Sequence, residues 1–471
     1  MKTFYIMDKG RMITMITKKL LSGFISGLLV ISLLAGCSKK AETTEATKAP
    51  EATTAADAST PAATPAPTEA QTSAPAEKVT LTLLANQDWA NNPIVKKAWA
   101  LYQEKTGNKL DIQGVPIDSW EKVMKTKFAT GEMTDIVMYY GGYQLSAIQP
   151  DKNFVDMSAE PWVGDLKDFV LPQVKVKDKV FGLPLWEGSV SGMLYNKEIF
   201  AKYNIAVPTT QEEFLAACET LKKNGIAPIY MAFKDTWPLL PQFGLDPVFK
   251  KDPTLLDKLN TNQAKFGDVK ELKDLVAWYK MLADKGYLGE KFSTNTWDGQ
   301  PAAISSGKYA MVYAWDTYIE SDLEKKEPGI SAKIGLMPMF LGVNNEGTYE
   351  GPNAIATYVN KNSKHVEQAK EFIKFLAQTE NLNEIYKDQK TQTYFNSVTT
   401  NAPTPQYLAA KDSVDKLINA SVQQNIIGYS QVEVVKPLQD LMLGGKTVDE
   451  AIKAMDDERI KSAKAQKIAG F

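Results

Sequence analysis

Among the places where a flat aromatic ring directly precedes a carboxylate, two pairs are the main candidates for a binding site. The pairs are Trp186 with Glu187 and Trp315 with Asp316. A sugar ring has apolar C–H faces and a rim of hydroxyls, so a site for one needs aromatic surfaces together with carboxylates or amides. Each pair supplies both kinds of group. Packing of the tryptophans into a core is the alternative reading of either pair.

Paired carboxylates also carry out glycoside hydrolysis, with Glu187 and Asp316 as acid and base, but the sequence does not give their separation. The one histidine, His365, begins an amphipathic helical stretch, and Cys37 and Cys218 are the only cysteines. A histidine near a helix start is expected to be solvated, so we expect no Ser-His or Cys-His relay, and one histidine with two cysteines is too few for a metal cluster built from His or Cys. We therefore expect no catalytic residues, no metal and no cofactor, although a calcium site made of carboxylates alone stays open.

Strand and helix patterns alternate from residue 79 to residue 140. Strands are expected over 79–85, 109–116 and 134–140, and helices over 91–107 and 118–131. This order predicts an α/β fold with a mainly parallel sheet flanked by helices. Ligands of such sheets lie beyond the carboxyl ends of the strands, which makes Asp88 and Tyr140 candidate binding residues.

A series of later motifs occurs in a characteristic order. It runs from Gly-Leu-Pro at 182–184 through "LYNKEIF", "KYNIAVPTTQEEF", "SSGKYAMVYAWD", "KIGLMPM" and "EGPNAIATYVN" to "GGKTVDEAIKAM". This series resembles the carbohydrate-type (maltose-binding-like) extracellular solute-binding proteins of ABC transporters. The resemblance extends from about Val79 nearly to the C-terminus.

The resemblance implies a periplasmic-binding-protein-like fold with two α/β lobes, each a mainly parallel sheet flanked by helices, that close on a sugar in the cleft between them. Lobe 1 would comprise residues 79–188 and 355–403, and lobe 2 would comprise residues 189–354 and 404–471. Strands that cross between the lobes would act as the hinge.

The resemblance also sharpens the choice of binding residues. Trp186 lies at the first expected crossing, and Trp315 matches a motif whose aromatic residue commonly stacks on sugar. Trp237 falls where family members place another aromatic loop, and Asn353 is placed to donate to a hydroxyl unless it is only a turn residue. Weaker candidates are Trp297, Asp298 and Tyr429.

The N-terminal region predicts export and membrane attachment. An uncharged apolar run follows Lys18 and Lys19 and ends in "LAGC", which resembles the bacterial lipobox. The resemblance implies a signal peptide over 1–36 and a diacylglyceryl anchor on Cys37, with an uncleaved signal-anchor helix as the alternative. Residues 37–78, rich in Ala, Thr, Pro and Glu, are expected to form a disordered tether or a glycosylated stalk.

Charge and composition limit the partners. The net charge is −2, with no concentration of basic residues, so nucleic acid is not expected as a partner. We expect a monomer, lipid-anchored on the extracellular face of the membrane, that binds a small carbohydrate and delivers it to the permease subunits of an ABC transporter. The alternatives are a cell-surface glycan hydrolase that uses Glu187 and a glycan adhesin or sensor without transport.

Overall fold

The computed structural model of this chain describes residues 78–239, 245–421, 425–430 and 433–471. The expected signal peptide, Cys37 and all but the last residue of the expected tether lie outside these ranges. Within the described ranges, no helix has both the length and the apolar character needed to span a bilayer.

The first sheet is built around parallel strands from the start of the described chain. The order is β2-β1-β3-β12-β6, and β1 pairs in parallel with both β2 and β3. Every residue from Leu83 to Asn86 in β1 is buried, as expected for a central strand covered on both faces. The strand bounds are β1 Thr80–Asn86, β2 Lys109–Val115, β3 Ile136–Tyr140, β6 Gly182–Leu183 and β12 Ile355–Val359.

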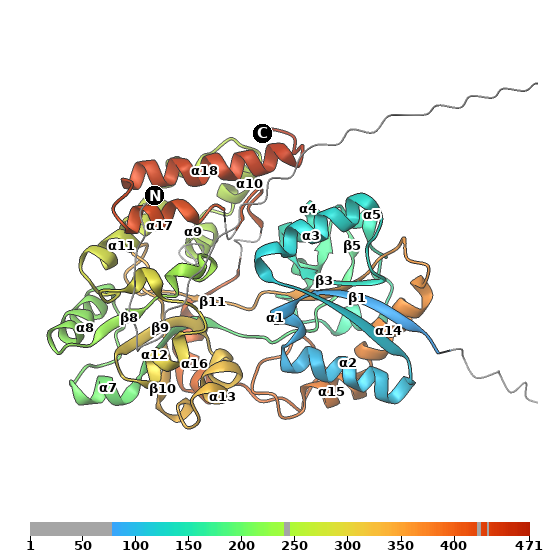
Figure 1. The fold of residues 1–471 in the computed structure, drawn as a ribbon, viewed down its shortest axis with the longest axis horizontal. Coiled ribbons are helices and arrows are strands. Elements are labelled where there is room, and N and C mark those ends of the chain that lie inside the picture. Colours follow the sequence, from blue (N-terminus) through green and yellow to red (C-terminus); the bar gives the residue numbers. More distant parts are fainter. Residues whose placement is uncertain (1–77, 240–244, 422–424, 431–432) are drawn as a thin grey trace, which may run out of the picture. The chain divides into compact units, whose positions relative to one another are not determined.

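Helices cover this sheet on both sides. Figure 1 shows α2 (Pro93–Thr106), α14 (Val366–Ala377) and α15 (Thr379–Tyr386) on one side and α3 (Ile117–Thr130) on the other. The helix predicted over 91–107 is confirmed as α2: Pro93 occupies its first turn, and Gly107 ends it with a φ of 71°.

The second sheet lies in the later part of the chain. Its strand order is β13-β11-β7-β9-β8, and β10 also pairs with β7. The longest strands, β7 and β9, are antiparallel neighbours, with Ser191 opposite Trp315. The bounds are β7 Ser191–Asn196, β8 Ala227–Tyr230, β9 Tyr309–Trp315, β10 Ile334–Met337, β11 Tyr349–Glu350 and β13 Ile418–Asn419.

Helices on the two faces of the second sheet form two cores. One core contains side chains of α8 (Gln211–Lys223), α11 (Lys270–Asp284), α17 (Lys436–Met442) and α18 (Val448–Ala465). The other contains Ile304 of α12 (Gln300–Ser305) and Val414 of α16 (Pro405–Leu417). Cys218 is a fully buried residue of α8 with a free thiol.

The expectation of mainly parallel sheets is wrong for the second sheet and only partly right for the first. In the first sheet, β12 runs antiparallel to β3 and to β6. In the second, β7 runs antiparallel to β9, β10 and β11. The reason is that β12 and β7 each follow a passage of the chain from the other lobe. As a result, β12 begins opposite the last residue of β3, and β7 begins opposite the last residue of β9. A strand that enters a sheet where its neighbour ends must run in the opposite direction.

The cores show where the chain passes from one lobe to the other. The first core takes residues from Leu81 to Leu185 and from Ala354 to Val398. The cores of the second lobe take residues from Val190 to Tyr349 and again from Val414 onward. The chain therefore crosses three times, over residues 185–190, 349–354 and 398–414, and we call these the first, second and third crossings.

Candidate functional site

The first crossing carries the predicted pair Trp186 and Glu187. Its backbone is held by the end of the first lobe: Tyr386 Oη donates to the Trp186 carbonyl at 2.6 Å, and the Gly188 amide donates to the Gln392 carbonyl at 2.9 Å. A Cβ atom on residue 188 would lie 2.8 Å from that carbonyl oxygen, so only glycine fits here. Trp186 is partly buried and packs against the first core.

The carboxylate of Glu187 faces both lobes. It accepts from Asn92 Nδ2 of the first lobe at 3.4 Å. Burial raises the pKa of Glu187 to about 7; a hydrogen bond from Thr317 opposes this rise, and the negative charge of Asp316 adds to it. Near neutral pH this carboxyl can therefore accept a hydroxyl hydrogen bond or donate one.

Trp315 ends β9 and belongs to a cluster of aromatic rings in the second lobe. Its ring centroid lies 6.2 Å from that of Trp237, with the planes 24° apart, and 5.8 Å from that of Trp297. Trp297 also lies 4.7 Å from Tyr318. All three tryptophans are partly exposed, and each also packs against a core of the second lobe. The structure thus brings together residues that the sequence placed in separate motifs.

Asp316 follows Trp315 directly, but its environment differs from the predicted one. The residue is only 1% exposed. One carboxylate oxygen accepts from the Val190 amide at 2.7 Å, and the other accepts from Thr404 Oγ1 at 2.6 Å. Burial raises the pKa of Asp316 to about 6, and these hydrogen bonds oppose the rise. The carboxylate therefore ties the first crossing to the third, and its contact with a ligand hydroxyl stays a prediction.

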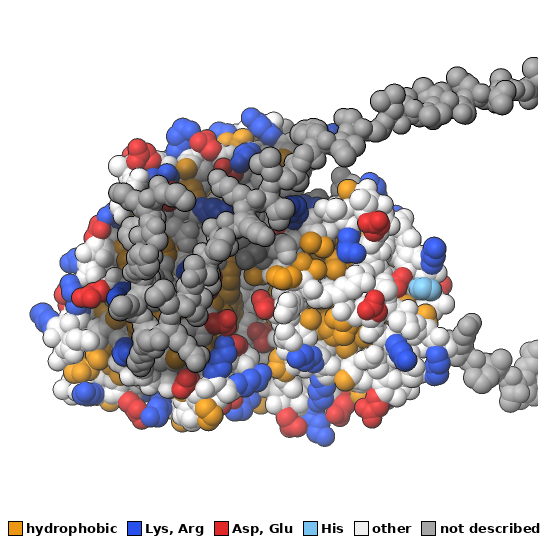
Figure 2. Space-filling model, in the orientation of Figure 1, with side chains coloured by type: hydrophobic (Ala, Val, Ile, Leu, Met, Phe, Trp, Pro, Cys, Tyr) orange, Lys and Arg blue, Asp and Glu red, His pale blue; other side chains and the backbone are white. Residues whose placement is uncertain are grey.

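The first lobe contributes Asp88 and Tyr140 where β1 and β3 end. Asp88 lies in the short helix α1 (Gln87–Ala90) and is exposed. Loss of water around it and the negative charges of Asp298 and Asp322, both from the second lobe, raise the pKa of Asp88. Acidic groups of the two lobes thus lie within electrostatic reach of each other, and Figure 2 shows acidic side chains gathered near the middle of the face in view.

Tyr140 is packed edge-on against a tryptophan of the same lobe. The Tyr140 and Trp89 rings are 4.7 Å apart at 84°, and Trp89 in turn contacts Trp120 at 5.5 Å. Tyr140 keeps part of its surface exposed, whereas Trp120 is fully buried. Of these three rings, Tyr140 is the one that keeps exposed surface at the carboxyl ends of the strands, because Trp89 and Trp120 are buried.

The second crossing carries Asn353 and a residue that sequence reasoning missed. Asn353 Nδ2 donates to Glu350 Oε1 at 3.0 Å, and Glu350 is fully buried. Burial and the nearby acid Asp246 raise the pKa of Glu350 well above its ordinary value. Tyr394 Oη lies 2.7 Å from the Asn353 carbonyl and 2.9 Å from the Glu187 carbonyl, so its hydroxyl joins the first and second crossings.

The missed residues had weak sequence signals. Glu350 stands in the quoted motif "EGPNA", where the glycine and proline attract attention first, and Asp246 before Pro247 reads as an ordinary helix start.

In the described ranges, no group of three or more His, Cys, Asp or Glu side chains is arranged to hold a metal ion.

The raised pKa of Glu187 predicts a pH dependence of stability. A carboxyl whose pKa is higher in the folded state than in the unfolded state binds its proton more tightly when folded. Its contribution to the free energy of unfolding is therefore fully present below pH 4.5, the ordinary pKa, and is lost as the pH rises through about 7. Glu187→Gln should remove this contribution, so the melting temperature of the variant relative to the wild type should rise between pH 4.5 and pH 7.5. Glu290→Gln, at an exposed position, is the control. A melting-temperature difference that stays constant with pH would contradict the assignment.

Comparison with known proteins identifies the family. Residues 84–382 match the sequence profile of the bacterial extracellular solute-binding proteins. A multiple sugar-binding protein of Streptococcus mutans is 22% identical over 289 residues, covering 60% of this chain and 68% of that protein. The melibiose/raffinose/stachyose-binding protein MelE of Bacillus subtilis is 23% identical over 341 residues, covering 68% of this chain and 75% of that protein.

A solved structure shares the fold. The crystal structure of a sugar transporter protein from Bacillus licheniformis, in complex with stachyose, superposes with a TM-score of 0.66 at 21% identity, covering 81% of this chain and 100% of that chain. Because the family profile spans most of the two lobes, this chain belongs to the bacterial extracellular solute-binding protein family.

Proposed function

We propose that the protein captures a carbohydrate between its two lobes and delivers it to the permease subunits of an ABC transporter. The observation that carries the proposal is the cluster of Trp237, Trp297 and Trp315, whose partly exposed rings lie where β9 ends. Aromatic faces of this kind cover the C–H faces of a sugar ring. The names of the relatives, which include sugar-binding proteins from two bacteria, support the same ligand class.

Polar groups for the hydroxyls come from the crossings and from the first lobe. Glu187 and Asn353 lie on two crossings, and Asp88 and Tyr140 lie at the strand ends of the first lobe. Groups from both lobes around one ligand favour a closed state when the ligand is bound, with the crossings as the hinge.

Binding without hydrolysis is favoured over a glycan hydrolase. A hydrolase needs two carboxyl groups that are free to face the glycosidic bond. Asp316, the partner that the sequence offered to Glu187, is buried with both oxygens engaged in the chain. We therefore assign Glu187 to binding and propose that the protein is not an enzyme.

A panel of neutral oligosaccharides tests the proposal. Isothermal titration calorimetry with raffinose, stachyose, xylo-oligosaccharides and chito-oligosaccharides should show binding by at least one series, and the sugar should be recovered without new reducing ends. New reducing ends would support the hydrolase. Absence of binding across the panel would overturn the choice of neutral sugars as the ligand class.

Trp315→Ala should weaken binding of the panel sugar by about 2 kcal/mol or more, the range of a buried aromatic hot spot. Ligand-free stability should fall by less than the roughly 3 to 5 kcal/mol of a core truncation. Trp278→Ala, at a buried position in the second lobe, is the matched control and should lower the melting temperature instead. Unchanged affinity with a collapsed melting temperature would assign Trp315 to the core and move attention to Trp186 and Trp237.

We further propose that the protein acts as a monomer on the extracellular face of the membrane, anchored through Cys37. Two acyl chains on one residue would satisfy the requirement for stable attachment, because a single chain gives only reversible binding. The sequence up to Cys37, with its basic pair, apolar run and small residues, supports this proposal.

Cys37→Ser should release the protein from the membrane fraction of the cells that make it. Cys218→Ser is the control and should stay membrane-bound, because Cys218 is a buried core residue. A Cys37→Ser protein that stays in the membrane fraction with an intact N-terminal peptide would show that the anchor is the signal segment itself.

A further inference from the structure

Asn92 connects the start of α2 in the first lobe to the first crossing. The two ends of its side chain have different partners. The amide oxygen accepts from the Ile94 amide at 2.9 Å and so caps α2, and the amide nitrogen donates to Glu187 Oε2 at 3.4 Å. Asn92 is only 9% exposed, so little water competes for these hydrogen bonds. One side chain thus ties the start of a helix to a candidate binding residue.

The amino end of α2 suits a carboxylate. The helix is 14 residues long, and the partial positive charge at its amino end favours a nearby negative group. The first turn of α2, which the structure describes in full, contains no acidic residue. Glu187 reaches this end from the first crossing through Asn92 and can supply the negative charge.

The other groups around the Glu187 carboxyl act in both directions. Burial raises its pKa to about 7, and the negative charges of Asp316 at the end of β9 and of Asp322 in the helical turn Ile319–Leu323 add to the rise. Hydrogen bonds from Thr317 and Asn92 oppose the rise. Removal of the Asn92 donor should therefore favour the protonated carboxyl.

Two tyrosines of the first lobe also approach this residue. Tyr386 Oη and Tyr394 Oη donate to the backbone carbonyls of Trp186 and Glu187, at 2.6 and 2.9 Å. Burial raises the pKa of both phenols above the ordinary value, so they stay neutral near pH 7. They fix the backbone of the crossing and leave the Glu187 carboxyl to Asn92.

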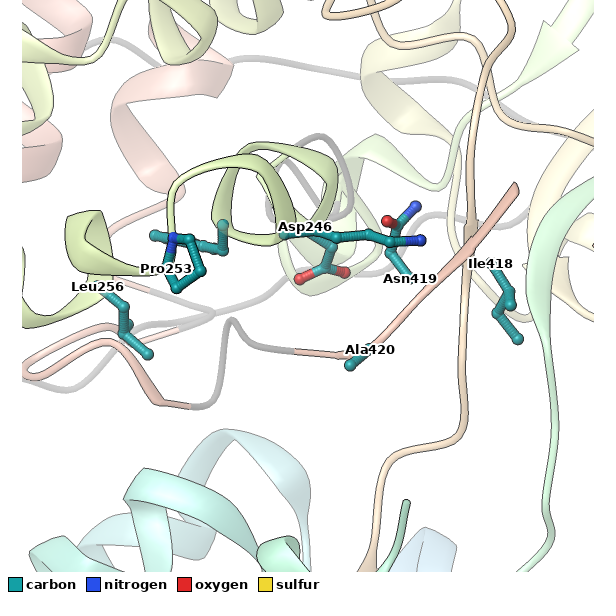
Figure 3. A pocket seen from close by; sticks show the side chains of 8 residues that line it. Asp246, Pro253, Leu256, Ile418, Asn419 and Ala420 are labelled. Atoms are coloured by element: carbon teal, nitrogen blue, oxygen red, sulfur yellow. The ribbon is translucent and has the colours of Figure 1, made fainter. Parts of the chain in front are cut away.

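The acids beside the second crossing are arranged differently. Glu350, which is fully buried, faces another acid, Asp246 at the start of α9 (Asp246–Lys251). Figure 3 shows Asp246 and Asn419 beside a cavity of about 370 Å³ between α9, α10 (Thr254–Asn260) and β13. A neighbouring acid favours the protonated form of a carboxyl. Glu187 is partly exposed, so of Glu187 and Glu350 it is the one that a ligand can contact.

We propose that Asn92 is a positioning residue of the binding site, which holds the Glu187 carboxyl at the amino end of α2 as a hydrogen-bond acceptor for a ligand hydroxyl. An ionised carboxylate accepts hydrogen bonds and cannot donate them. A sugar that donates a hydroxyl hydrogen to Glu187 therefore binds more tightly as the pH rises through about 7. This inference rests on the proposed function and adds to it the protonation state of Glu187 and the residue that favours it.

Substitutions at Asn92 separate its two hydrogen bonds. Asn92→Ser keeps an oxygen that caps α2, but the side chain is shorter and no longer reaches Glu187. Asn92→Asp also keeps a capping oxygen and replaces the donor with a second carboxylate. Asn196→Ser is the matched control, because the Asn196 side chain caps α7 (Lys197–Lys202) in the second lobe. Glu187→Gln removes the titrating group.

Isothermal titration calorimetry on the full chain, at pH 5.5, 7 and 8.5, uses the panel sugar that the wild type binds most tightly. Wild-type affinity should rise by about tenfold or more across this range, and the affinity of Glu187→Gln should not change with pH. Asn92→Ser should lose about threefold or more at pH 7 and less at pH 8.5, where Glu187 is ionised in both proteins. Asn92→Asp should lose more than Asn92→Ser at pH 7, and Asn196→Ser should match the wild type throughout.

Melting temperatures without ligand establish that each variant is folded. An equal loss for Asn92→Ser at pH 7 and pH 8.5, or no loss, would reduce Asn92 to a helix cap and overturn the proposal. Wild-type affinity that does not change with pH, or a pH dependence that persists in Glu187→Gln, would overturn it as well. A wild-type protein that binds no sugar of the panel would instead overturn the proposed function.

Discussion

The buried carboxylate of Asp316 is the interaction on which the arrangement of the two lobes depends. Its two oxygens accept from the Val190 amide on the first crossing and from Thr404 Oγ1 on the third. A buried carboxylate without such donors would carry a large desolvation cost, so the crossings and the charge stabilise each other. Tyr394 completes the set, because its hydroxyl contacts carbonyl oxygens of the first and second crossings. The three crossings are thereby fixed relative to one another.

This network places the binding groups without using them. Trp315 precedes Asp316, Glu187 lies three residues before Val190, and Asn353 lies on the second crossing, so each candidate is attached to a fixed point. Rigid placement of these groups lowers the ordering cost of binding, so closure of the lobes need only bring the groups of the first lobe onto the ligand. The tie through Asp316 also explains why this carboxylate is a poor partner for acid-base chemistry with Glu187, although the two residues influence each other electrostatically.

Much of the local structure could be predicted from the sequence. A capping box of Thr447 and Glu450 starts α18, and Thr210 caps α8; both follow the Thr-x-x-Glu pattern, which can be recognised in the sequence. These signals are local, since a cap and the amides it accepts from lie within one turn. The α/β class with two lobes was also predictable, from the alternation of strands and helices and from the order of the motifs.

Long-range features were beyond reach of the sequence. Nothing near Asp316 in the sequence indicates that it will contact Thr404, 88 residues later. A carboxylate that accepts from a ligand hydroxyl and a buried carboxylate that accepts from groups on the crossings look alike in sequence. The same holds for Asp246 with Glu350, two acids brought together in the second lobe by packing of α9 near β11. The prediction of strand direction was wrong for a related reason. The direction of β7 and of β12 depends on the end of the sheet at which the chain arrives from the other lobe.

The central claim is that one carbohydrate contacts both lobes at the crossings. A crystal structure of the protein with the panel oligosaccharide that it binds most tightly tests this claim most directly. We expect a sugar ring against the indole of Trp315, with Asp88 or Tyr140 of the first lobe in contact with the same ligand molecule. An oligosaccharide bound to one lobe alone, or bound away from Trp315 and the three crossings, would contradict it.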